Sequence, residues 1–186
     1  MSKTLWALDP AHTQIEFAVK HMMFTTVRGR FSSFEGQVRL DQARPEDSSV
    51  EVTIDVESID TGVAQRDQHL RSGDFFDVET FPQMRFRSTG VSGSLEADSA
   101  LTLTGELTIR DVTREVVLEG TYDGSGTDPW GGTRSGFTAH AVIDRRDFGL
   151  TWNQTLEAGG VLVGTDVKIS LQVQAVLQVE ETATTS

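Results

Sequence analysis

Residues 13–23, TQIEFAVKHMM, alternate between apolar and mostly polar side chains. Ile15, Phe17 and Val19 occupy every second position, and His21 and Met23 follow in the same phase. Because successive side chains of a β-strand point to opposite faces, this pattern predicts a strand with one buried and one solvated face. The same phase assigns His21 to the buried face.

The alternation recurs along the rest of the chain, between short turns rich in Gly, Asp and Pro. In the last segment, nine of the ten odd positions from Val161 to Val179 are apolar, and so long a strand is expected to bend near Gly164. Eight segments of this kind predict an all-β antiparallel barrel or sandwich. The candidate strands are residues 13–23, 27–40, 50–56, 83–91, 101–110, 115–122, 135–143 and 161–179.

One segment, about residues 61–82, lacks the alternation and predicts a short helical insert. Thr61 is a possible N-cap and Gly73 a possible stop signal. Phe75, Phe76 and Phe81 follow closely, and three phenyl rings need a buried environment. We therefore expect the insert to cap one end of the β-structure, either as a stabilising plug or as a lid over a cavity.

Length and composition limit the possible partners. The 186 residues fit one domain, which we place at 1–179, with 180–186 as a disordered tail. A net charge of −12 and the absence of a basic cluster argue against nucleic acid and anionic membrane as partners. No apolar run is long enough for stable membrane insertion. Met1–Leu8 shows no secretory signal, so we expect a cytoplasmic protein.

Motifs for catalysis are absent from the sequence. There is no cysteine, H-E-x-x-H pair, G-x-S-x-G elbow, phosphate-binding loop or G-x-G-x-x-G motif. His12 and His21 are nine residues apart on one predicted strand, so they point to opposite faces and cannot share a metal. We interpret the run from Asp144 to Asp147 as a charged strand-end network in preference to a catalytic pair. We expect no enzymatic activity, no cofactor and no metal.

His21 has three interpretations. It is a hydrogen-bonded core group, a contact for the polar group of a ligand, or an axial ligand of haem. An eight-stranded barrel is either filled by side chains or holds one small ligand. The sequence leaves that choice open, although the inward set of Ile, Val, Leu, Phe and Met would suit a long hydrocarbon.

From about Leu5 to Ala175, the residues resemble the YceI-like proteins, a family of lipocalin-like barrels associated with polyisoprenoid binding. Eight pieces carry the resemblance in order. They are Asp9, His12, Phe17 and His21; Gly29, Phe31, Phe34 and Gly36; Ser58, Ile59, Thr61 and Gly62; Arg66, Asp67, His69, Leu70, Ser72, Asp74, Phe75 and Phe76; Phe81, Pro82, Met84, Phe86, Ser88 and Thr89; Gly105, Leu107, Thr108, Ile109, Val112 and Thr113; Asp144, Arg145, Asp147, Phe148, Gly149 and Leu150; and Val163, Gly164, Val167 and Ile169.

The resemblance implies an extended eight-stranded antiparallel barrel with an inserted helix, often a homodimer, that holds an isoprenoid or quinone-like chain in its lumen. Many relatives are exported, whereas this chain shows no signal peptide. Two positions depart from the family pattern: Thr13 stands where Ser is common, and Asp111 where Gly is usual.

The leading hypothesis is a non-enzymatic protein that binds, transports or stores a polyisoprenoid or a similar long-chain amphiphilic lipid. His21 would bond the head group, and the other residues would make apolar contacts. The alternatives are a haem- or quinone-linked redox protein that uses His21, and a packed, stress-related barrel without a ligand. The candidate ligand-binding residues are Ile15, Phe17, Val19, His21, Phe31, Phe75, Phe76, Phe81, Met84 and Phe86.

Overall fold

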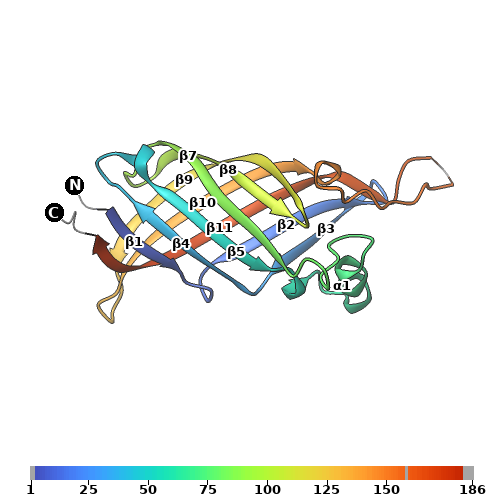
Figure 1. Cartoon of the computed structure of the whole chain (residues 1–186), viewed down its shortest axis with the longest axis horizontal. Coiled ribbons are helices and arrows are strands. Elements are labelled where there is room, and N and C mark those ends of the chain that lie inside the picture. Colours follow the sequence, from blue (N-terminus) through green and yellow to red (C-terminus); the bar gives the residue numbers. More distant parts are fainter. Residues whose placement is uncertain (1–2, 158, 182–186) are drawn as a thin grey trace.

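The longest strand, β11 (Val163–Glu181), organises the sheet. The computed structural model describes residues 3–157 and 159–181. Along one edge β11 pairs with β10 (Thr133–Asp144). Along its other edge it pairs first with β2 (Gln14–His21) and then with β1 (Lys3–Leu8). The two strands on that edge lie end to end, which makes the barrel elongated (Figure 1).

Eight strands close into a barrel in the order β1-β4-β5-β7-β8-β9-β10-β11, because β11 also pairs with β1. All neighbours in this ring are antiparallel. The predicted eight-stranded antiparallel barrel is confirmed. Its remaining strands are β4 (Phe34–Leu40), β5 (Ser49–Asp55), β7 (Gln83–Gly93), β8 (Ser99–Ile109) and β9 (Val112–Thr127).

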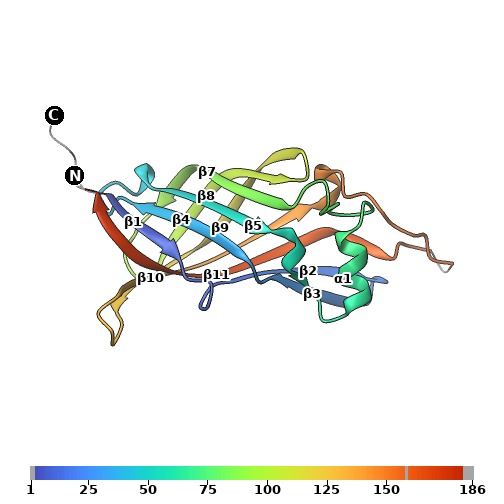
Figure 2. The same cartoon turned by 60° about the horizontal axis from the view of Figure 1, so that its bottom comes forward.

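At the other end the wall is extended by β2, β3 (Thr25–Phe31) and the short β6 (Ile59–Asp60). Helix α1 (Ala64–Arg71) follows β6 and lies beside β3 at this end (Figure 2). Arg71 attaches the helix to the wall, since its guanidinium donates to the carbonyl oxygens of Glu57 and Ile59. Three short 3-10 helices complete the structure: Pro45–Asp47, Val56–Ser58 and Arg145–Phe148.

The membership of the eight strands differs from the prediction. Residues 27–40 form two strands, β3 and β4, which pair with different neighbours. Strand β1 was missed, because its six residues are too short to show a clear period. The register of β11 against β2 is irregular between Val163 and Val167, around the predicted bend. Residues 180 and 181, which the sequence assigned to the tail, pair with β1. The rest of that predicted tail, residues 182–186, lies outside the described residues.

The first predicted strand is also shorter than expected at both ends. His12 lies in the turn between β1 and β2, where its Nδ1 contacts the Asp9 carboxylate at 2.8 Å. The assumption that His12 and His21 share one strand is therefore wrong. Met23 does not continue the buried face, because β2 ends at His21 and the chain turns back into β3.

The helix begins at Ala64, and its N-cap position is Val63, so Thr61 is not the cap. Instead, the Thr61 amide and hydroxyl both donate to Oδ1 of the buried Asp67, at 2.9 and 2.5 Å. The helix ends before Gly73, with Ser72 as its C-cap. The predicted insert is confirmed, but side-chain bonds within the loop replace a conventional cap.

The barrel end around β1 is filled by side chains. Ala175, Ser135 and Tyr122 are buried there, and the Tyr122 hydroxyl bonds the Ser135 hydroxyl at 3.2 Å. Toward α1 the inward residues of β11, such as Ile169 and Leu171, are only half-buried. The inward side chains are fully buried at the β1 end of the barrel and only partly buried along its middle part, which we call the shaft. This difference indicates an internal space that opens toward the helix.

Candidate ligand cavity

A cavity of about 670 Å³ occupies the barrel between the packed end and α1. Inward residues of β2, β3, β5, β7, β8, β9, β10 and β11 line it, together with the helical insert. Along the shaft the lining is almost entirely aliphatic and aromatic. The shaft includes Val52, Ile54, Leu101, Leu103, Leu107, Leu118, Ala139, Ile169, Leu171 and Val173.

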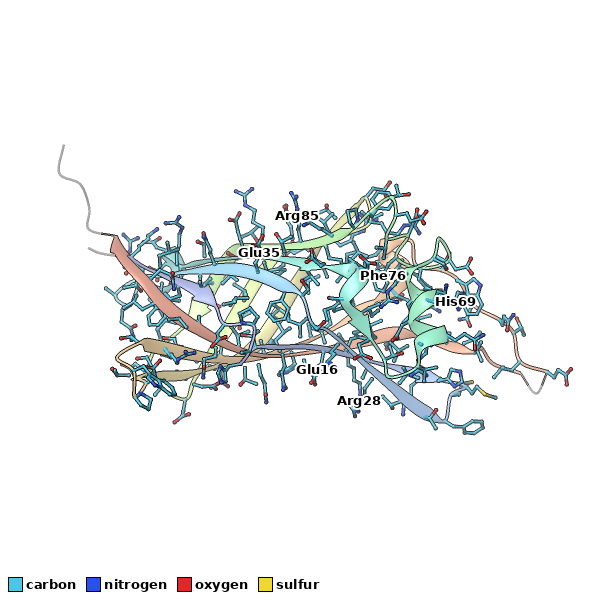
Figure 3. All side chains as sticks on the ribbon, turned by 90° about the horizontal axis from the view of Figure 1, so that it is seen from below. Glu16, Arg28, Glu35, His69, Phe76 and Arg85 are labelled. Atoms are coloured by element: carbon cyan, nitrogen blue, oxygen red, sulfur yellow. The ribbon has the colours of Figure 1, made fainter. Side chains whose placement is uncertain are left out.

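The outer face of the same wall is charged. Figure 3 shows Glu16, Arg28, Glu35 and Arg85 on the outside of the barrel, and all four are exposed. The period-two alternation thus separates a charged exterior from an apolar interior, as the strand geometry requires.

Nine of the ten candidate residues line the cavity. They are Ile15, Phe17, Val19, His21, Phe31, Phe75, Phe76, Met84 and Phe86. Phe81 is the exception, because its ring lies beneath the Arg110 guanidinium, 5.7 Å from the guanidinium carbon, and does not line the cavity.

Two glycines shape the inner wall by leaving room for phenyl rings. A Cβ on Gly29 would lie 2.3 Å from Cζ of Phe17, its cross-strand partner. A Cβ on Gly105 would lie 2.4 Å from Cζ of Phe86. Both rings therefore lie over glycine backbone against the wall, and cavity volume is preserved.

His21 is half-buried at the last position of β2 and lines the cavity near its mouth. Its carbonyl oxygen accepts from the Phe24 amide at 3.2 Å. Within residues 3–157 and 159–181, however, its ring nitrogens have no hydrogen-bond partner. This finding argues against a hydrogen-bonded core histidine and leaves the imidazole free to bond a ligand or solvent.

Polar side chains gather at the α1 end of the cavity. Arg66 and His69 come from α1, and His21 from the end of β2. The Arg66 guanidinium donates to the hydroxyl and carbonyl oxygens of Thr61, each at 2.7 Å. A cavity with an apolar shaft and one polar end matches the shape of an amphiphile with a long tail and a small head.

Three aromatic side chains meet at this mouth. The His69 ring lies edge-on to Trp152 and to Phe75, with centroid distances of 4.6 and 5.2 Å. His69 Nε2 also contacts the Asp74 carboxylate at 2.8 Å. Figure 3 shows His69 and Phe76 at the barrel end that α1 covers. These contacts hold the helix at this end of the cavity.

Arg145 holds the loop that carries Trp152, and sequence reasoning missed this role. Its buried guanidinium donates to the carbonyl oxygens of Leu150, Trp152, Val163 and Gly164, at 2.6 to 3.2 Å. Burial lowers the pKa of Arg145. Its neighbour Arg146 forms the expected strand-end ion pair with Asp144 at 2.6 Å. Adjacent arginines thus face opposite ways, and only the structure distinguishes them.

Metal-binding clusters and membrane-spanning helices are both absent from the part of the chain that the structure describes. No group of three or more His, Asp or Glu side chains in residues 3–157 and 159–181 is arranged to hold a metal ion. In the same residues, no helix has the length and apolarity that a membrane crossing demands.

Comparison with known proteins places the chain in a family. Residues 6–175 match the model of the YceI-like domain. A UPF0312 protein of Pseudomonas aeruginosa is 43% identical over 139 residues, which cover 75% of this chain and 71% of that protein. The crystal structure of BcnA from Burkholderia cenocepacia has a TM-score of 0.77 at 25% identity and covers 90% of this chain and 98% of its own.

A polyisoprenoid-binding domain from Saccharophagus degradans shares the fold, with a TM-score of 0.69, 14% identity, and coverage of 93% of this chain and 98% of that domain. The family match spans both the barrel and the helical insert. The chain belongs to the YceI-like family.

Proposed function

We propose that this protein binds a polyisoprenoid or a similar long-chain amphiphilic lipid in its barrel, and transports or stores it without chemical change. The observation that carries the proposal is the cavity of about 670 Å³ with its apolar shaft and single polar end. That volume falls within the range of roughly 300–1,000 Å³ typical of ligand sites. The fold shared with a polyisoprenoid-binding domain supports the ligand class.

The energetics suit a hydrocarbon tail. Each methylene removed from water contributes about 0.8 kcal/mol, so ten of them contribute about 8 kcal/mol before the cost of immobilising the chain. The head group would lie at the α1 end, where His21 has an unpaired imidazole. The alternative of a packed barrel without a ligand requires that side chains fill the lumen. The inward side chains along the shaft are only half-buried, which argues against that alternative.

The sharpest test is a substitution that fills the apolar shaft of the cavity. Leu171 points into the cavity, whereas the next residue of β11, Gln172, is exposed on the outer face. We expect Leu171→Trp to weaken binding of cis-parinaric acid, a fluorescent long-chain probe, by about tenfold or more, because the indole fills space that the chain needs. Gln172→Trp is the matched control and should bind as the wild type does.

Two results would contradict the proposal. One is equal probe binding by both tryptophan variants. The other is native mass spectrometry of protein purified from its own host that shows only the apo mass. If the measured mass exceeds the apo mass, lipid extraction from the same preparation identifies the ligand.

The redox alternative rests on His21 alone. Haem titration followed at the Soret band tests it, with His21→Ala as the control. No spectral change in the wild type excludes the haem form. We also propose a homodimer, which rests on the family resemblance; a light-scattering mass equal to the 20.4 kDa of one chain would refute it.

A further inference from the structure

Consecutive apolar side chains project into solvent at the tip of the β2–β3 hairpin. Met22, Met23 and Phe24 keep 42%, 64% and 83% of their accessible area. Val161, in the loop before β11, keeps 39%. The two segments touch, since the Met22 amide donates to the Leu162 carbonyl at 2.8 Å. We call Met22, Met23 and Phe24 the apolar tip.

The backbone of the tip gives no folding reason for these residues. Met22 and Met23 have φ of 51° and 65°, and the Phe24 amide closes the turn on the His21 carbonyl. The turn from His21 to Phe24 lies within a three-residue hairpin loop, and positive φ at both of its central positions favours Asn-Gly. Each larger residue there costs about 1 kcal/mol. Two methionines therefore occupy a turn that disfavours them while remaining outside the core, which points to a function at the surface.

The charge around the tip is opposite to that of the whole protein. Although the chain has 28 acidic and 16 basic residues, the stretch from Lys20 to Arg30 contains three basic residues and no acidic one. Arg30 pairs with Asp60 of β6 at 3.6 Å, which leaves Lys20 and Arg28 as the basic side chains beside the tip. Lys20 and Arg28 flank the tip and are exposed. The neighbouring loop, residues 151–165, has one acidic residue, Glu157, and no basic one, so the positive charge comes from the hairpin alone. Apolar side chains between basic ones suit the interface of a phospholipid bilayer. There the apolar side chains enter the acyl region, and the basic side chains contact the phosphate groups.

The tip continues directly into the cavity mouth. His21 precedes it in the chain and lines the cavity, and Leu162, bonded to Met22, lines it as well. We propose that the apolar tip docks this end of the barrel on a phospholipid surface, so that a lipid passes between bilayer and cavity without crossing water. The docking itself does not depend on what the cavity holds.

Vesicle flotation tests the proposal. The vesicles contain phosphatidylcholine with a minority of phosphatidylglycerol. Wild-type protein should float with the vesicles, and Phe24→Ser should lower the apparent affinity by about tenfold or more, because a phenyl ring is lost from the apolar phase. The double variant Met22→Asn, Met23→Gly installs the preferred turn residues, so it should fold at least as well and still lose affinity.

Trp130 supplies the matched control. It is 88% exposed in the connection between β9 and β10, at the barrel end opposite α1 (Figure 1). Trp130→Ser should float as the wild type does. The proposal would be overturned if the wild-type protein does not bind the vesicles, or if the tip variants float as well as the wild type. It would also be overturned if the tip variants convert a dimer to a monomer, because a second copy of the chain would then cover the tip.

Binding of cis-parinaric acid in the absence of vesicles separates this proposal from the proposed function. Tip variants that keep probe binding but lose flotation support docking. If the wild-type protein floats through its tip but binds no probe, the docking proposal is supported and the proposed lipid-binding function is refuted.

Discussion

The imidazole of His69 and the indole of Trp152 meet edge to face, with ring centroids 4.6 Å apart and ring planes at 90°. His69 belongs to α1 and Trp152 to the loop between the last 3-10 helix and β11. The contact joins two segments that are distant in sequence, and it lies across the mouth of the cavity. It is therefore expected to control how fast a ligand enters and leaves.

Trp152→Ala should accelerate ligand release. Edge-to-face aromatic pairs contribute about 0.5–1.5 kcal/mol, so we expect the dissociation rate of cis-parinaric acid to rise about two- to tenfold. Stopped-flow dilution measures that rate. Trp130→Ala removes an indole at the opposite end and should leave it unchanged; equal rates for the two variants would show that the aromatic contact does not restrict the mouth.

Arg145→Lys should destabilise the protein. Four carbonyl oxygens share one planar guanidinium, and an ammonium with three donors cannot reach them all. Unpaired buried carbonyls should lower the free energy of unfolding by about 2–4 kcal/mol. Urea unfolding followed by circular dichroism measures this. Arg146→Lys is the control, because that side chain is 59% exposed and should tolerate the change; a similar loss in both variants would contradict the assigned role.

Two glycine substitutions should have different effects. At Gly29 the three atoms nearest to a new Cβ all belong to the Phe17 ring, which can swing into the cavity. Gly29→Ala should therefore cost little stability but weaken probe binding. At Gly120 the Cβ would lie 1.9 Å from the Thr138 carbonyl oxygen, which belongs to the backbone of the next strand. Gly120→Ala should lower the free energy of unfolding by about 1–3 kcal/mol or more. The reverse order of stabilities in urea unfolding would refute the prediction.

Asp9 should contribute to stability at neutral pH and lose that contribution in acid. A hydrogen bond from Arg134, and then one from His12, lower the pKa of Asp9 from 3.8 to about 2. The unfolded chain thus binds the proton more tightly than the folded one. The stabilisation is complete above the unfolded pKa of 3.8 and disappears as the pH falls through the folded value near 2.

Asp9→Asn tests this dependence. The variant should be less stable than the wild type at pH 7, and the difference should shrink as the pH falls from about 4 to about 2. Urea unfolding at several pH values measures it. Glu51→Gln removes a carboxylate that is 70% exposed and should show a much smaller effect. If the difference in unfolding free energy between the wild type and Asp9→Asn does not change with pH, the charge of Asp9 does not stabilise the fold.

Local patterns predicted the inward residues well. Ile15, Phe17 and Val19 line the cavity because strand phase is a property of neighbouring residues and requires no knowledge of the partner strand. Phe81 was wrongly assigned because the insert is not a strand, and proximity to other phenylalanines in sequence does not establish its direction. Arg145 was missed because adjacent charged residues at a strand end look alike until the chain turns between them.

The sequence by itself determined an antiparallel barrel or sandwich, its apolar inward faces and the helical insert, since these follow from side-chain periodicity and its interruption. The choice of a barrel came from the resemblance to the YceI-like family. Only the tertiary structure decided that the lumen is hollow, that His21 lacks a partner and that His69 and Trp152 meet at the mouth. Interior volume depends on how eight strands tilt and close, and mouth contacts join residues from distant segments. Neither property is encoded in any local stretch of the chain.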